Sequence, residues 1–207
     1  MSTHSVRYCR DVSRTRAEAL PPDERRAHIV AAARPLLLAY GTSATTRQIA
    51  DAAGIAEGTI FRVFDDKDAV IDAVIEEVTD VTSVVAALGE LDRSLPLEER
   101  LVAAVDIVRR RISAVFEMAS ALGPRFAAGR AGSNEDRVVA RVAALAELFD
   151  PDRDALRVDP LRAARALHGL TIASTHPLLT SGEPLDSNEI VSLLLDGIRT
   201  PPQDSAC

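Results

Sequence analysis

The stretch TTRQIADAAGIAEGTIFRVFDDK, residues 45–67, decides the fold because its local chemistry predicts a short helix that ends in a tight turn. Thr45 and Gln48, three residues apart, form a capping-box pair that favours a helix start. We therefore predict a helix over Thr46–Ala53. Gly54 ends this helix, because glycine adopts the positive φ of a tight turn at little steric cost.

A second short helix is predicted over Glu57–Phe64, and its two faces differ in character. Apolar side chains recur at helical spacing on the inner face, where Ile49, Ala50 and Ala53 of the first helix would meet them. The outward face is polar and aromatic, and it has the right size to enter a DNA major groove. The candidate DNA-contacting residues on this face are Glu57, Gly58, Thr59, Phe61 and Arg62.

These features resemble the TetR family of transcriptional regulators, in detail over residues 24–76 and beyond them only in length and all-helical pattern. The matching residues are Thr45-Thr46-Arg47, Ile49-Ala50, Gly54, Gly58-Thr59-Ile60-Phe61, Phe64 and Lys67. The resemblance implies that Thr46 and Arg47 contact a phosphate and a base edge, that the second helix reads bases, and that Lys67 holds a phosphate. Lys67 is also the only lysine of the chain, which fits a point-charge contact to phosphate.

Two residues depart from the family pattern. Phe61 stands where the family usually has tyrosine, so only ring contact remains, for example with a thymine methyl group. Ala56 stands where a serine or threonine would cap the second helix, and Glu57 can offset that loss at the positive helix end. Glu57 therefore has two interpretations: it accepts a hydrogen bond from cytosine N4, or it only stabilises the helix start.

Composition supports an all-α fold in a chain of 207 residues, because aromatic residues make up only 3% and alanine, leucine and valine dominate. Residues 1–67 carry a net charge of +2 and the remainder −9, which orients the N-terminal part toward a polyanion. No long apolar segment or signal-peptide pattern occurs, so we expect a cytoplasmic protein with no membrane contact. Cys9 and Cys207 suggest neither a metal site nor a disulfide.

The chain divides into an N-terminal arm, two domains and a tail. Residues 1–20 are predicted to be a disordered basic arm, either solvated or lying along DNA. Residues 21–67 form the helix-turn-helix DNA-binding domain, residues 68–200 the ligand-binding and dimerisation domain, and residues 201–207 a tail. In the first helix, after Pro21-Pro22, we expect a kink or an irregular turn near Ala31 to Pro35. The predicted inner stripe of this helix is Ile29, Ala33, Leu36, Leu37 and Tyr40.

One long helix over 66–88 is predicted to join the two domains, because apolar residues recur along it at three- and four-residue steps. A small rotation at its far end would turn the DNA-binding domain relative to its partner. Further helices are predicted over Leu97–Leu122 and Glu135–Phe149. The run Arg109-Arg110-Arg111 could be a nucleic-acid patch, but we favour a solvated or ion-paired face.

The last two predicted helices are candidates for a dimer interface. The helix over Leu161–Thr175 is apolar on nearly every side, so it must be covered all round. The final helix begins at the cap pair Asp186 and Glu189 and carries a strong apolar stripe. We expect a homodimer with four helices meeting across a two-fold axis, as the resemblance also implies.

The predicted function is a ligand-responsive transcriptional regulator, and the resemblance favours a repressor. A dimer would place two recognition helices about 34–36 Å apart on a pseudo-palindromic operator in double-stranded DNA, and a small-molecule effector would release it. The candidate effector-binding residues, for each of which we favour a plain core role, are Phe116, Met118, Phe126, Phe149 and His168.

The alternative is a helical small-molecule carrier, or an enzyme, with no DNA-binding role. No cofactor, metal site or catalytic residue is predicted, because the histidines are scattered and no His-x-x-x-His or Cys-x-x-Cys spacing occurs. A pure carrier would leave the helix-turn-helix unexplained. The four histidines are His4, His28, His168 and His176.

Overall fold

The computed structural model describes residues 21–129, 134–176, 179–180 and 184–198, and within these ranges it is helical with no strand. The arm predicted over residues 1–20 and the tail predicted over 201–207 lie outside the described residues. The α-helices are α1 (Pro22–Tyr40), α2 (Thr46–Ala53), α3 (Glu57–Ile60), α4 (Lys67–Thr79), α5 (Thr82–Gly89), α6 (Leu97–Leu122), α7 (Pro124–Gly129), α8 (Asn134–Glu147), α9 (Pro160–Thr175) and α10 (Ser187–Ile198). Two 3-10 helices, η1 (Gly41–Ser43) and η2 (Asp150–Ala155), complete the order.

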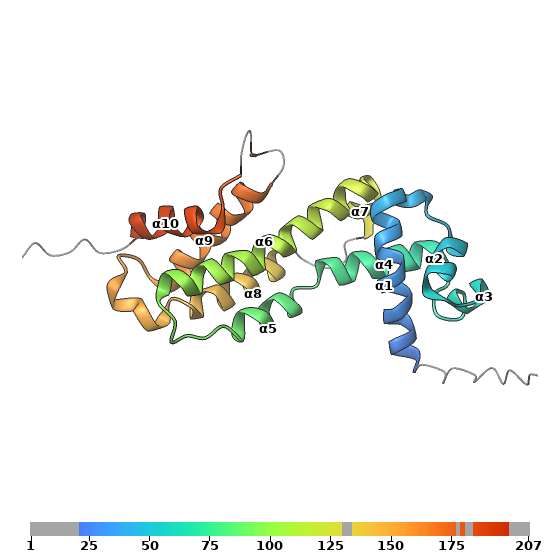
Figure 1. Ribbon diagram of the computed structural model, residues 1–207, viewed down its shortest axis with the longest axis horizontal. Coiled ribbons are helices and arrows are strands. Elements are labelled where there is room, and N and C mark those ends of the chain that lie inside the picture. The colour runs from blue at the N-terminus through green and yellow to red at the C-terminus, as the bar shows by residue number, and fades with distance from the viewer. Residues whose placement is uncertain (1–20, 130–133, 177–178, 181–183, 199–207) are drawn as a thin grey trace, which may run out of the picture.

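The molecule is elongated, with α1 to α4 gathered at one end and α9 and α10 at the other (Figure 1). Helix α6 runs between the two ends. Among the described helices, none combines the length and the apolar character that crossing a membrane requires.

A first hydrophobic core lies under the helix-turn-helix. It contains Ile29 and Leu37 of α1, Ile49 of α2 and Ile60 of α3, all fully buried, together with apolar residues of α4 from Val70 to Val78. It also takes in Met118 and Leu122 from the end of α6 and Phe126 from α7. The domain boundary predicted after residue 67 therefore falls inside a continuous core.

A second hydrophobic core joins α5, α8, α9 and α10 to the N-terminal part of α6. Leu101, Val105 and Val108 of α6 lie in it, whereas Met118 of the same helix lies in the first core. Because protein interiors are close-packed, a displacement of α6 in one core is felt in the other. Helix α6 is thus a direct mechanical connection between the two ends of the molecule.

The prediction of a single helix over 66–88 is wrong, because α4 ends at Thr79 and α5 begins at Thr82. Asp80 between them is extended, with φ −62° and ψ 127°. Its carboxylate accepts hydrogen bonds from the backbone N–H of Thr82 at 3.2 Å and from the Thr82 hydroxyl at 2.8 Å. Such local bonds compete with the helical pattern, and apolar periodicity alone does not register them.

Two expectations for α1 also need correction. The helix continues through Pro35 from Pro22 to Tyr40, without the irregular turn predicted there. Tyr40, predicted to face inward, is 55% exposed, whereas Ile29, Ala33 and Leu37 are fully buried.

Arg100, only 2% exposed, fixes the loops at the far end of α6. Its Nε donates to the carbonyl oxygen of Leu148 at 2.9 Å, and its Nη1 donates to those of Arg93 at 3.0 Å and Leu95 at 2.5 Å. Its Nη2 pairs with the carboxylate of Asp152. A buried guanidinium is tolerated here because its donors are matched by acceptors from two separate loops.

Helix α9 buries one side in the second core and exposes the other. Ala163, Ala164 and Leu167 are almost fully buried. The opposite side is exposed and carries the small side chains Ala166, Gly169 and Ala173 together with Arg162 and Arg165. Leu161 at the start of the helix and Leu193 on the neighbouring α10 are also exposed. The helix is therefore not covered all round within one chain.

Candidate nucleic-acid interface and internal cavity

The start of α2 and the turn after it form as their sequence predicts. The N–H of Gln48 donates to Thr45 Oγ1 at 3.2 Å, and the N–H of Thr45 donates to Gln48 Oε1 at 2.8 Å, which completes the capping box. Gly54 is left-handed, with φ 65° and ψ 30°. This conformation, which favours glycine, turns the chain sharply from α2 into α3.

Helix α3 is shorter than the predicted span Glu57–Phe64, because the structure assigns only Glu57–Ile60 to it. Phe61–Val63 continue as a turn. Ala56 supplies no side-chain cap, as its chemistry predicts, and Gly58 lowers the helical propensity of this segment. The candidate recognition surface is therefore one helical turn followed by a turn segment.

The outward face of this segment is open to solvent. Glu57, Gly58 and Arg62 are exposed, Phe61 is 51% exposed, and Thr59 is half-buried. Phe61 is thus a large apolar ring held on the surface, beside a cation.

Arg47 and Thr46 border that face from the start of α2. Arg47 is exposed, and Thr46 is half-buried. The Thr46 hydroxyl donates to Glu57 Oε1 at 2.6 Å. This bond ties the N-terminus of α2 to that of α3, and the separate motifs of the sequence did not indicate it. It also occupies the Glu57 carboxylate, for which the sequence left two roles open.

Lys67, at the first position of α4, is half-buried and already has a partner. Its Nζ donates to the carbonyl oxygen of Thr42 at 2.8 Å. An ammonium group has three donors, so this bond leaves donors for a phosphate oxygen. Asp66 caps α4 by accepting from the N–H of Ala69 at 2.8 Å.

Two contacts from α1 hold the helix-turn-helix in place. His28 Nε2 donates to the carbonyl oxygen of Ala53 at 2.8 Å, at the end of α2. The guanidinium carbon of Arg26 lies 4.5 Å from the centre of the Phe64 ring, in a cation–π contact. Both contacts fix the inner side of the motif and leave its outward face free.

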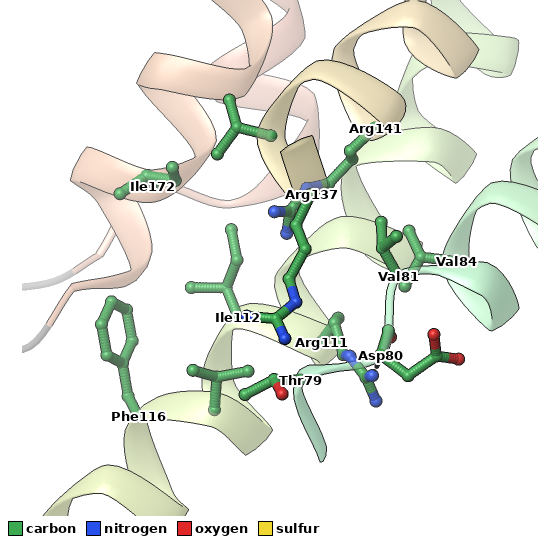
Figure 2. Close-up of a pocket in the computed structure, with 12 residues that line it drawn as sticks. Thr79, Asp80, Val81, Val84, Arg111, Ile112, Phe116, Arg137, Arg141 and Ile172 are labelled. Atoms are coloured by element: carbon green, nitrogen blue, oxygen red, sulfur yellow. Dashed lines mark hydrogen bonds between the residues drawn. The ribbon is translucent and has the colours of Figure 1, made fainter. Parts of the chain in front are cut away.

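An internal cavity of about 210 Å³ lies beside the break between α4 and α5 (Figure 2). Its walls come from α4 and α5, from α6, from α8 and from α9. The lining residues are Thr79, Asp80, Val81, Val84, Arg111, Ile112, Val115, Phe116, Arg137, Val138, Arg141 and Ile172.

Of the five predicted effector-binding residues, only Phe116 lines this cavity. Met118 and Phe149, each 0% exposed, and Phe126, 5% exposed, fill the two hydrophobic cores and do not line this cavity. His168, 5% exposed, is buried but does not line this cavity. Burial, and to a lesser extent the charge of Arg141, lower its pKa to about 4, so the ring is neutral at neutral pH.

Three arginines of the cavity wall were not predicted from the sequence. Arg111 holds the break between the two helices, because its Nη2 donates to the carbonyl oxygen of Glu77 at 2.9 Å and also to that of Asp80. It is the only member of the arginine run that lines the cavity. Arg137 and Arg141 are four residues apart, and Arg141 precedes buried Leu145 by another four. This spacing places both arginines on the buried face of α8, and charged residues at such positions could have indicated a polar cavity.

The electrostatics of this wall are positive. Although burial raises the pKa of Asp80, hydrogen bonds from Thr82 and the charge of Arg111 give a net lowering, so the carboxylate is ionised. Burial lowers the pKa of Arg141, and the charge of Arg111 adds to that effect. The described residues contain no group of three or more histidine, cysteine or acidic side chains that could hold a metal ion.

The sequence model of the family described as bacterial regulatory proteins, tetR family, matches residues 29–74, which span most of the helix-turn-helix region and α4. No curated protein sequence matches the chain. Solved structures do: a TetR transcriptional regulator from Streptomyces coelicolor is 27% identical with a TM-score of 0.56, and the match covers 85% of this chain and 99% of that one.

Two further solved structures share the fold at lower identity. Escherichia coli NemR in its reduced form is 16% identical with a TM-score of 0.59, covering 86% of this chain and 100% of that chain. A TetR-family protein from Mesorhizobium loti is 19% identical with a TM-score of 0.58, covering 88% and 100%. Members of this family are DNA-binding regulators and not enzymes. The N-terminal match and the fold shared along the described helices agree: the chain carries the N-terminal domain of the TetR family of bacterial regulatory proteins and resembles solved members of that family in fold.

Proposed function

We propose that this protein is a ligand-responsive repressor that acts in the cytoplasm, binds a pseudo-palindromic operator as a homodimer and leaves it when a small molecule occupies the internal cavity. The observation that carries the proposal is the open outward face of α3, flanked by Arg47 and Lys67 and backed by a fully formed core. A surface of this shape and chemistry suits a DNA major groove.

Each exposed residue has a distinct proposed role. Arg47 contacts a base edge, and a bidentate bond to guanine would contribute about 1–3 kcal/mol of discrimination. Lys67 holds a phosphate with the donors that its bond to Thr42 leaves free. Gly58, Thr59, Phe61 and Arg62 meet the groove, with the Phe61 ring against a thymine methyl group.

Glu57 and Thr46 act together in this proposal. The carboxylate of Glu57 is held 2.6 Å from the Thr46 hydroxyl, so we assign it the role of fixing α3 against the start of α2. Thr46 keeps its backbone N–H, at the positive end of α2, for a phosphate.

The dimer is proposed to form through the exposed sides of α9 and α10. The small side chains at Ala166, Gly169 and Ala173 allow a partner helix to approach closely, and Leu161 and Leu193 would be covered. Two-fold symmetry would then present two α3 segments to successive major grooves, about 34–36 Å apart.

The cavity is proposed to control the spacing of those segments through the α4–α5 break and α6. Arg111 links the break to α6, because it belongs to α6 and donates to the carbonyl oxygens of Glu77 in α4 and of Asp80 in the break. A ligand that moves Arg111 would therefore act on α4, whose first residue is Lys67. Coupling of about 1–3 kcal/mol would change operator affinity by roughly 5- to 150-fold.

The direct test is fluorescence anisotropy with DNA from the intergenic region upstream of the protein's own gene, with a shuffled fragment as the control. We expect tight, sequence-dependent binding and release by a cell extract that contains the effector. Equal binding to both fragments at physiological salt would contradict the proposed function.

Two alanine variants separate the proposed roles. Lys67→Ala should weaken binding to both fragments alike and reduce the salt dependence, the slope of log affinity against log salt, by about 1. Arg47→Ala should weaken binding mainly to the operator, by about 1–3 kcal/mol. Equal loss on both fragments from both variants would show that Arg47 makes no base contact.

A further inference from the structure

The cavity is lined by three arginines and by apolar side chains. Arg111 comes from α6, and Arg137 and Arg141 come from α8. Asp80 is the one acidic residue among the lining residues, and Figure 2 shows its carboxylate directed away from the middle of the cavity. Its oxygen is already bound by the backbone and hydroxyl of Thr82. The lining therefore carries three arginines and one carboxylate, and that carboxylate is turned away from the cavity.

Arg141 is the least satisfied of the three arginines. Its Nε is buried and has no hydrogen-bond partner in the part of the chain that the structure describes. A buried donor on a charged group is costly when it is unmatched. Arg111 and His168 do not relieve this cost, since Arg111 is itself positive and His168 supplies no negative charge. An anionic group in the cavity would supply the missing acceptor.

The rest of the wall is apolar. Phe116 and Ile172 lie on the side of the cavity away from Asp80 and Val84, with arginine side chains between them (Figure 2). Val115 and Val138 also contribute apolar surface. A fully polar anion would leave these side chains without contact, whereas a ligand with an apolar body would cover them.

We propose that the effector is an amphipathic monoanion, with a carboxylate or similar head between Arg111, Arg137 and Arg141 and an apolar body against Phe116 and Ile172. The role of this ligand as an effector rests on the proposed function. The preference for an anion is a property of the cavity itself. The head group would meet a planar guanidinium that can donate two parallel hydrogen bonds. A body of limited size is required, because the cavity measures about 210 Å³.

The test compares two probes that differ only in the head group, 4-phenylbutyrate and 4-phenylbutan-1-ol, titrated into the full-length protein at pH 7.5 and followed by ligand-detected NMR. We expect the acid to bind at least about ten-fold tighter than the alcohol, the ratio that one charge-assisted hydrogen bond supplies. The acid should also raise the melting temperature of the protein more than the alcohol does at equal concentration.

The variant Arg141→Met removes the cation and retains a long apolar side chain. It should reduce the preference for the acid without abolishing it, because Arg111 and Arg137 remain beside the head group. Arg110→Met is the matched control, because Arg110 is exposed on α6 and does not line the cavity, and it should keep the preference for the acid. Should Arg141→Met fail to fold, the comparison of the two probes on the wild-type protein still decides.

Equal or tighter binding of the alcohol to the wild-type protein, or no binding of either probe at 5 mM, would overturn the inference. Neither result bears on DNA binding, since no DNA is present in the titration. Failure of the DNA experiment above would instead remove the proposed function and leave the measured preference of the cavity in place.

Discussion

Replacing Arg111 with methionine is expected to destabilise the junction between α4 and α5. In the native protein its Nη2 donates to the carbonyl oxygen of Glu77 at 2.9 Å and to that of Asp80, at the point where α4 ends. Hydrogen bonds that involve a charged group contribute about 1.5–3 kcal/mol each when they are buried. Because Arg111 is half-buried, water replaces part of this contribution, and we expect a loss of about 2 kcal/mol in the free energy of unfolding.

The assay is urea denaturation followed by circular dichroism at 222 nm, at one fixed protein concentration because a dimer's stability depends on concentration. A loss of about 2 kcal/mol corresponds to a melting temperature lower by roughly 4–8 °C in a chain of this size. Amide hydrogen exchange should also become faster near Asp80, where the helix ends are no longer held.

Arg110→Met is the matched control for this variant. Arg110 is the neighbouring residue, is exposed, and makes no side-chain hydrogen bond or ion pair within the described ranges, so its replacement should change stability by no more than about 0.5 kcal/mol. Equal stability of the two variants would refute the view that Arg111 holds the junction.

Further variants test the backbone, the buried histidine and the buried arginine. Gly41→Ala should lower the free energy of unfolding by more than about 2 kcal/mol, because Gly41 has φ 55° and an added Cβ would lie 2.6 Å from the Ala121 carbonyl oxygen. An added Cβ at Gly54 meets nothing within 4 Å, so Gly54→Ala should cost only about 1 kcal/mol of backbone strain. Between pH 7.5 and pH 5, the free energy of unfolding of the wild-type protein should fall by about 2 kcal/mol more than that of His168→Gln. The reason is that His168 takes up a proton near pH 6.5 in the unfolded chain, whereas in the folded protein it stays neutral down to about pH 4. Arg100→Met should cost at least about 3 kcal/mol, since it leaves the partners of four hydrogen bonds unmatched.

Urea denaturation measures each of these expected changes, and each has an outcome that would contradict its reasoning. Equal cost at Gly41 and Gly54 would mean that the helix end at Ala121 can move freely. Parallel pH profiles for wild type and His168→Gln would show that the folded protein protonates His168 as readily as the unfolded chain does. A nearly neutral Arg100→Met would mean that the loops at that end are held by packing alone.

The helix-turn-helix could be predicted from the sequence because the interactions that define it are local. Thr45 and Gln48 cap α2 within one turn, and Gly54 takes the positive φ that the next turn requires. The capping argument at Ala56 also holds, since α3 begins without a side-chain cap. The exposure of Arg47 follows from the same helical geometry.

Other features depend on partners far apart in the chain. The Thr46 hydroxyl and the Glu57 carboxylate are eleven residues apart, and Arg111 binds carbonyl groups of residues 77 and 80. Apolar periodicity through residues 66–88 runs across the break at Asp80, because the pattern of hydrophobic side chains records what is buried and not where the backbone changes direction.

The sequence by itself determined that the chain is all-α and that a helix-turn-helix stands near its N-terminus, since capping, turn and amphipathic signals act over a few residues. Only the tertiary structure decided which side chains surround the cavity. The side chain of Phe116 lines the cavity, whereas the equally apolar Met118, Phe126 and Phe149 fill the cores. Arg141 lines the cavity although it belongs to a helix whose sequence is simply amphipathic. The physical reason is that a cavity is what remains when several helices pack, so its lining is set by the crossing of α5, α6, α8 and α9 and not by any one of them.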